Sequence, residues 1–162
     1  MAARRLAIAA IVALAGCQAP SPPATERVVI AGETFGLELA VDERSRVRGM
    51  MARVAFPDQG GMLFVFPEAT ERSFWMANCL IDIDLLFLDA RGTITAVHHM
   101  MIEPPPADGE SLLAYEGRLL RYWSNGPAQF AVELKPGAVD RLGVGVNDRI
   151  DLDLRRLKDM AR

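Results

Sequence analysis

The chain has 162 residues, of which 51% are hydrophobic and 24% are charged, and its formal net charge is −3. This length suits one domain with a proper core and is too short for two domains of ordinary size. The acidic balance argues against nucleic acid as a partner, because phosphate binding needs a basic surface.

The N-terminus has the pattern of an export signal. Arg4 and Arg5 precede an apolar run over residues 6–15, too short for the ~20 residues of a membrane-spanning helix. The run ends in "LAGC", which resembles the lipobox of bacterial lipoproteins, where cleavage precedes the cysteine and lipid is attached to its sulfur. We therefore predict a signal peptide over residues 1–16, and a lipid on Cys17 that anchors the protein to the membrane. The alternative is an ordinary secretory signal that happens to contain a cysteine.

Residues 17–26 form the predicted tether, which is stiffened by three prolines. Gln18 follows the cysteine, where an aspartate would resemble an inner-membrane retention signal, so the periplasmic face of the outer membrane is the expected location. The signal peptide carries two of the 18 basic residues and none of the 21 acidic ones, so the mature net charge is −5. A single domain is predicted over residues 27–155, followed by a tail over residues 156–162.

The first half of the domain alternates between strands and one helix. Residues 28–41 read as a hairpin that turns at residues 31–33. Asp42 can cap a helix through about Val54, with Val47, Met50, Met51 and Val54 as its core stripe. A central strand over residues 62–66 ends at Pro67, and the segment "RSFWM" is a further short strand.

The second half is mostly strand. Residues 81–88 pass through a turn at residues 89–92 into the strand "TITAVHHM", and "EPPPADGE" is a long, candidate functional loop. The strand "AQFAVEL" precedes a short helix over residues 136–142, and "DRIDLDL" closes the domain as a strand. The prediction is an α+β fold, mainly β. Its mostly antiparallel sheet should close into a small barrel or sandwich with one or two short helices.

Several segments in this order resemble the domain of unknown function 192 family of bacterial and archaeal proteins. The most specific are the paired cores "GMLFVF" and "FWMANC", and "GPAQFAVELKPGAVDRLGVGVND" extends the similarity to most of residues 28–154. The resemblance implies a compact, mainly β domain, often exported, without an established activity. Ala77 and Cys79 occupy positions where the family usually has lysine and threonine, so a site that uses those positions would be altered here.

A recognition site is the first chemical hypothesis. An aromatic side chain with a few convergent polar groups is typical of small-ligand pockets, and the candidates here are Arg53, Asp58, Trp75, Asn78 and Asp84. The structural alternative pairs Arg53 with Asp84 and buries Trp75 in the core. We expect this ion pair in either case, because a carboxylate in an apolar strand needs a partner.

Metal and thiol chemistry form the second hypothesis. His98, His99 and Glu103 are weak candidates for a metal site, since adjacent strand residues point to opposite faces. Cys79 has apolar neighbours and, if Cys17 carries lipid, no partner in its own chain, so we expect a buried, reduced and inert thiol.

The function predicted from these features is that of an envelope lipoprotein without catalytic residues, cofactor or resident metal. It would bind a small ligand or an envelope protein, but not nucleic acid. The alternative is a metal- or thiol-dependent hydrolase of envelope material.

Overall fold

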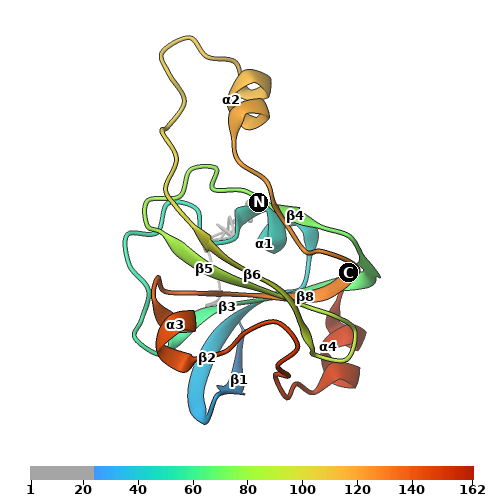
Figure 1. The fold of residues 1–162 in the computed structure, drawn as a ribbon. Helices are drawn as coiled ribbons and strands as arrows, with labels where there is room; N and C mark the ends of the chain where they lie inside the picture. Colours follow the sequence, from blue (N-terminus) through green and yellow to red (C-terminus); the bar gives the residue numbers. More distant parts are fainter. Residues whose placement is uncertain (1–23) are drawn as a thin grey trace, which may run out of the picture.

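The structure, a computed structural model, describes residues 24–162, so the predictions for the signal peptide, Cys17 and most of the tether concern residues outside the described range. Six strands form the main sheet in the order β1-β2-β3-β8-β5-β6, and two more form a small second sheet (Figure 1). The main strands are β1 (Thr25–Ile30), β2 (Glu33–Ala40), β3 (Gly60–Thr70), β5 (Ile83–Leu88), β6 (Ile94–Met100) and β8 (Ala128–Leu134). The second sheet pairs β4 (Ser73–Phe74) with β7 (Tyr122–Trp123). The helices in this part of the chain are α1 (Glu43–Arg48), α2 (Leu112–Arg118), α3 (Ala138–Leu142) and α4 (Leu154–Met160).

The main sheet is mixed and open. Strands β2 and β3 pair in parallel, whereas the other neighbouring pairs are antiparallel. Parallel neighbours need a crossover of about a dozen residues or more, and residues 41–59 provide it. The predicted α+β, mainly β class is therefore confirmed, but closure into a barrel was wrong because β1 and β6 remain at opposite edges. The number of short helices is also higher than the one or two predicted.

Helix α1 is much shorter than the predicted helix. Asp42 caps it as expected and forms a capping box with Ser45, but the helix ends at Arg48. Gly49 follows with a φ of 45°, a conformation that glycine adopts more readily than other residues, and the chain then leaves the helical path. The expected core stripe was consequently wrong: Met50 is buried, whereas Val47 and Val54 are 64% and 78% exposed.

The two hairpins of the main sheet were predicted correctly. In the β1–β2 hairpin, Ile30 pairs with Glu33, and the intervening Ala31 and Gly32 have φ angles of 48° and 82°. Positive φ at both central residues is typical of a two-residue hairpin turn, because the twist of such a turn matches the twist of the flanking strands. The β5–β6 hairpin turns through Gly92, where an added Cβ would lie 2.6 Å from the carbonyl oxygen of Ile150.

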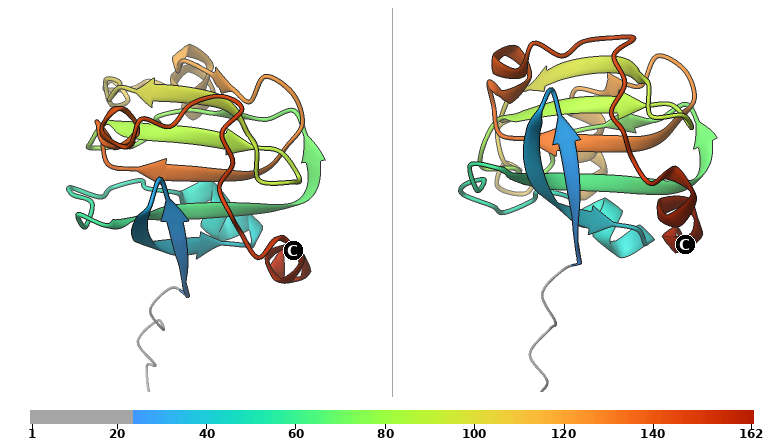
Figure 2. Two further views of the ribbon diagram at one scale, coloured as in Figure 1. Left: turned by 60° about the horizontal axis from the view of Figure 1, so that its bottom comes forward. Right: turned by 90° about the horizontal axis from the view of Figure 1, so that it is seen from below.

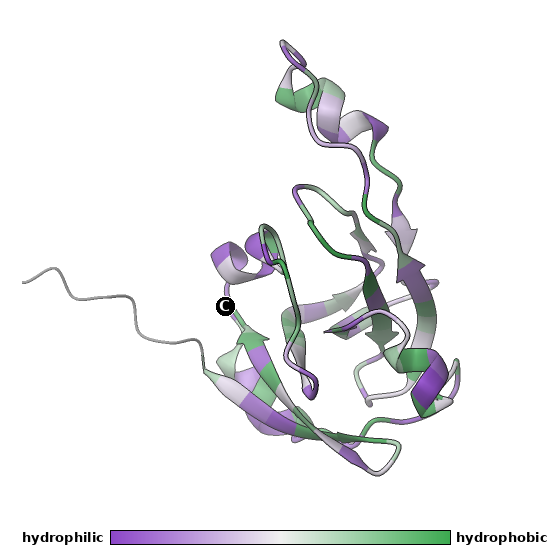
Figure 3. Cartoon of the chain, turned by 90° about the vertical axis from the view of Figure 1, so that its left-hand side faces the viewer, coloured by the Kyte–Doolittle hydropathy of each residue, from purple (hydrophilic) through white to green (hydrophobic). Residues whose placement is uncertain are grey.

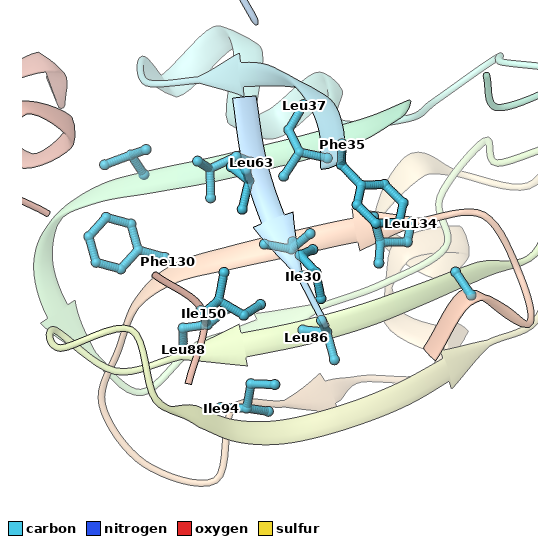
Figure 4. Packing of buried hydrophobic residues seen from close by; sticks show 14 of the residues in the cluster. Ile30, Phe35, Leu37, Leu63, Leu86, Leu88, Ile94, Phe130, Leu134 and Ile150 are labelled. Atoms are coloured by element: carbon cyan, nitrogen blue, oxygen red, sulfur yellow. The ribbon is translucent and has the colours of Figure 1, made fainter. Parts of the chain in front are cut away.

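Side chains on the two faces of the main sheet form separate cores. One face packs against α3 and α4, and the hairpin of β1 and β2 curls over it (Figures 2 and 4). Its members include Leu37, Leu63, Leu86, Phe130, Ile150 and Leu157. The other face, under α1 and β4, buries Met62, Phe64, Phe66, Leu85, Phe87 and Ala131. Successive residues of β3, β5 and β8 alternate between these cores, so the central strands are buried on both sides.

Three other sequence predictions differ from the structure. Strand β3 continues past Pro67 to Thr70, with an irregular register between Val65 and Thr70 that accommodates a residue without an N–H. The segment "DRIDLDL" forms only isolated bridges, Val29 with Asp151 and Thr93 with Arg149. Asp153 then caps α4, whose Leu157 is fully buried, so most of the expected tail is a packed helix.

Residues 101–121 form an arm that extends away from the body of the domain and carries α2 (Figures 1 and 3). It includes the predicted long loop and several exposed apolar side chains, among them Met101, Leu112, Leu113 and Leu120. In the described part of the chain, no helix has the length and apolar character needed to span a bilayer.

Candidate functional site

A pocket of about 290 Å³ lies on the α1 side of the main sheet. Its walls are largely apolar, with Phe64 and Phe66 from β3, Phe74 from β4, and Trp75 and Met51 from the adjoining loops. Pockets of this kind, apolar with a few polar groups, are typical small-molecule sites. Its polar lining residues are Glu43, Arg46, Arg48, Arg72, Ser73, Cys79 and Glu133.

Glu133 is the buried polar group of this pocket. It belongs to β8, where Met62 of β3 and Leu85 of β5 are its direct neighbours, so a central strand carries it into the core. The residue is only 5% exposed, and its Oε2 is buried without a hydrogen bond within residues 24–162. Buried carboxyl oxygens normally have partners, so this atom is an exception within the described part of the chain.

Burial also changes the acidity of this carboxyl. It raises the pKa of Glu133 to about 8, because the ionised form loses its hydration, and the charge of Arg53 only partly opposes this effect. Arg53 is itself engaged: both of its terminal nitrogens donate to the carboxylate of Glu38. At neutral pH the Glu133 carboxyl is therefore mostly protonated and can donate a hydrogen bond as well as accept one.

Gln129 shows how a buried polar residue of the same strand is normally satisfied. It precedes Glu133 by four residues in β8, so both side chains lie on the same face of the strand. Gln129 is 6% exposed. Its amide nitrogen donates to the carbonyl oxygens of Phe66 and Pro67 at 2.6 and 3.1 Å. The missing partner of Glu133 is therefore a local feature of the pocket and not a general property of this sheet face.

Three arginines line the same pocket. Arg46 donates to the carbonyl oxygen of Val65 at 3.0 Å, and Arg72 donates to that of Ala128 at 3.1 Å. The guanidinium of Arg72 also lies 3.7 Å from the centre of the Phe66 ring. Arg48 is exposed, and its guanidinium has no hydrogen bond or ion pair to any described residue. Fixed positive charge thus surrounds the pocket, with one guanidinium still unpaired.

The predicted recognition residues are not brought together. Trp75 is half-buried and lines the pocket, with the Arg121 guanidinium 4.0 Å from the centre of its ring. Asn78 has a φ of 54° and its N–H donates to the Tyr115 hydroxyl at 2.9 Å, which is a turn role. Asp58 pairs with Lys135 at the surface. Of the five candidates, only Trp75 lines the pocket.

The predicted pair between Arg53 and Asp84 is wrong. Asp84 is 1% exposed and lies on the other face of the sheet from Glu133. Its Oδ1 is 2.8 Å from His99 Nδ1, and its Oδ2 accepts from the Val139 N–H at 2.9 Å. The expectation that this carboxylate needs a partner was sound, but the partners come from β6 and α3.

The histidines point to opposite faces, as strand alternation predicted. His98 Nε2 lies 2.7 Å from the carbonyl oxygen of Trp123, whereas His99 lies beside Asp84. The pKa of His99 is raised, chiefly by its hydrogen bond with Asp84. Glu103, the third metal candidate, accepts from the Leu120 N–H. Across residues 24–162, no three His, Cys, Asp or Glu side chains are grouped so that they could hold a metal ion.

Cys79 is 8% exposed and forms no disulfide within the described residues, as expected for a buried thiol. Burial, and secondarily the charge of Glu133, raises its pKa to about 12. A thiol that stays protonated at neutral pH is a poor nucleophile. Cys79 and Ala77 both line the pocket.

Comparison with known families places this architecture. Residues 26–152 match the model of DUF192, a family described as an uncharacterised ACR. The chain belongs to this family. No curated protein matches it.

Two solved structures share the DUF192 chain's fold. A protein from Sinorhizobium meliloti 1021, provisionally described as a transcription regulator, is 31% identical, with a TM-score of 0.62 over 77% of this chain and 89% of that one. A protein of unknown function from Novosphingobium aromaticivorans DSM 12444 is 22% identical, with a TM-score of 0.63 over 90% of this chain and 94% of that one. The second similarity concerns the fold alone.

Glu133 was missed by sequence reasoning. The segment "AQFAVEL" was predicted as a strand, and its polar residues alternate in a way that is typical of a solvent-facing side. Only the central place of β8 in the sheet shows that this side is buried. A usable signal was nevertheless present, since an acid two residues after Ala131 interrupts a strand that is otherwise nearly apolar.

Proposed function

We propose that this protein is an envelope lipoprotein whose domain binds a small organic ligand in the Glu133 pocket. The observation that carries the binding role is the buried Oε2 of Glu133, which lacks a partner while lining an aromatic pocket. Ordinary packing offers no benefit for this arrangement, because an unmade hydrogen bond in the interior costs about 1–3 kcal/mol. A ligand group that pairs with Glu133 removes that cost.

The residues of the pocket support binding more than catalysis. The Cys79 thiol has a pKa of about 12, and His99 is on the other face of the sheet. The hydrolase alternative therefore has little support from the residues of the pocket. Regulation of transcription is not carried over from the Sinorhizobium protein, since the net charge of −3 gives no support for DNA binding.

Fragment binding to the purified full-length protein tests the binding role. A library of small polar aromatic compounds should raise the melting temperature of the wild type for some members, because a ligand that binds only the folded state stabilises it. Glu133→Leu should lose these shifts, since it removes the carboxyl with which the ligand pairs. Asp159→Leu, at an exposed position of α4 outside the pocket, is the control and should retain them. Shifts that are equal in both variants, or no shifts at all, would contradict the proposal.

The lipid anchor rests on the sequence "LAGC" at residues 14–17 and on the prolines that follow. Expressed in a bacterial host, the protein should be recovered with membranes, and metabolic labelling with a fatty acid should mark it. Cys17→Ser should abolish the label, and globomycin, which inhibits lipoprotein signal peptidase, should cause unprocessed protein to accumulate. A wild type that matures to a soluble, unlabelled form would overturn this part of the proposal.

A further inference from the structure

The pocket is lined by a buried acidic group and by an exposed basic group. Glu133 is buried and therefore marks the inner end, where a Cβ added at Gly49 would lie 3.5 Å from Phe64 Cζ and 3.7 Å from Glu133 Oε2. Arg48 lines the same pocket but is exposed, so it marks the opening. A bound molecule that fills the pocket would meet a carboxyl at its inner end and a guanidinium at its outer end.

The charges around the pocket favour a negative ligand. Three guanidinium groups line it, against the carboxyl groups of Glu43 and Glu133. The inner carboxyl is mostly protonated at neutral pH, so it offers an O–H to a ligand oxygen. Arg48 is unpaired, and a guanidinium fork suits the two oxygens of a carboxylate or phosphate.

On the basis of the proposed binding role, we propose that the ligand is an organic oxyanion with a flat apolar body. Its carboxylate or phosphate group pairs with Arg48 at the opening, and Arg46 and Arg72 add to the positive field. The body lies among Phe64, Phe74 and Trp75, and a carbonyl-type oxygen at its far end accepts a hydrogen bond from Glu133.

Several other ionisable groups lie around Glu133. Arg53 is paired with Glu38 in the neighbouring part of the sheet, and the pKa of Cys79 is raised to about 12. His98, on the same sheet face, contacts the Trp123 carbonyl. The pocket also contains the charged residues Glu43, Arg46, Arg48 and Arg72. The raised pKa of Glu133, about 8, makes this carboxyl the group whose ionisation is tested between neutral and mildly alkaline pH.

Three probes of one shape test the charge of the ligand. They are 4-acetylbenzoate, the uncharged 4-acetylbenzamide and the cationic 4-acetylbenzylamine, with dissociation constants measured by calorimetry on the full-length protein. The benzoate should bind most tightly. Arg48→Gln should weaken it by roughly three- to tenfold, as for the loss of one partly exposed charge pair. Arg44→Gln, on the same helix but outside the pocket, removes the same charge and should leave the affinity unchanged.

The pH dependence tests the role of Glu133. Affinity for the benzoate should fall about tenfold between about pH 7 and pH 9, because the ionised carboxyl can no longer donate and repels the ligand. Glu133→Gln keeps a donor, so it should still bind while losing this pH dependence. Preference for the amine, or an affinity that rises with pH, would overturn the oxyanion inference but leave the binding role intact. Failure of all three probes would also overturn the inference, and the wider fragment library then decides the binding role by itself.

Discussion

Glu133→Leu should make the protein more stable than the wild type at pH 8. The wild-type carboxyl has a pKa of about 8 when folded, against an ordinary value of 4.5. Its contribution to stability is therefore fully present below about pH 4.5 and is lost as the pH rises through about 8. That difference in pKa corresponds to roughly 4–5 kcal/mol at most, so we expect a gain of a few kcal/mol from the leucine. Urea unfolding at several pH values between 4.5 and 8.5 measures both the gain in the free energy of unfolding and the slope of that free energy against pH.

Gln129→Leu is the matched control for this experiment. It places the same residue on the same face of β8, but it removes a side chain whose amide has two backbone acceptors. The control should therefore destabilise the protein and keep the wild-type pH slope. A Glu133→Leu variant that is less stable than the wild type, with an unchanged slope, would show that the carboxyl is satisfied in the folded state.

A gain in stability combined with a loss of binding would have a physical meaning. Residues that cost folding free energy and have no partner in the fold are expected where function needs them. The free-energy cost of burying Glu133 would be highest at alkaline pH without ligand. It would be lower once a hydrogen-bonding group of the ligand contacts Glu133 Oε2. The two measurements together therefore distinguish a functional carboxyl from an accident of packing.

Local patterns predicted most of the strands, because alternation and turn chemistry are properties of short segments. The hairpin at Ala31 and Gly32 needs only its own residues to form. Closure of the sheet is different, since it depends on where the crossover after β2 places β3. The predicted first helix was too long for a local reason. Gly49 caps the C-terminus of α1, and the spacing of the apolar residues alone did not reveal this.

The candidate site was harder to predict, because it depends on cross-strand register and on long connections. Trp75 was identified from its residue type, and it does line the pocket. The partner of Asp84 depends on the β5–β6 register, which shifts at Phe87 and Leu88, so counting from the turn would have misplaced it. Arg53 reaches Glu38 because the crossover returns to β2, a path that is not encoded in any short motif.

Asp84→Ala should be among the most destabilising single substitutions at a polar position. Asp84 is 1% exposed and accepts from the Val139 N–H and from His99. The substitution leaves a buried backbone N–H without an acceptor and opens a small cavity, at a cost of roughly 2–4 kcal/mol. Asp84→Asn can still accept from Val139, so it should cost less.

The same pair predicts a pH dependence that has its origin in His99. The hydrogen bond with Asp84 raises the pKa of His99 above its ordinary value of 6.5. Protonated His99 therefore adds stability that is fully present below about pH 6.5 and is lost as the pH rises through the higher, folded pKa. His99 is half-exposed, so solvent should keep this contribution small. NMR titration of the imidazole should show the raised pKa in the wild type and a return towards 6.5 in Asp84→Asn, with His98→Gln as a control that leaves it unchanged. A His99 that titrates at its ordinary value in the wild type would refute the pair, whatever the stability of Asp84→Ala.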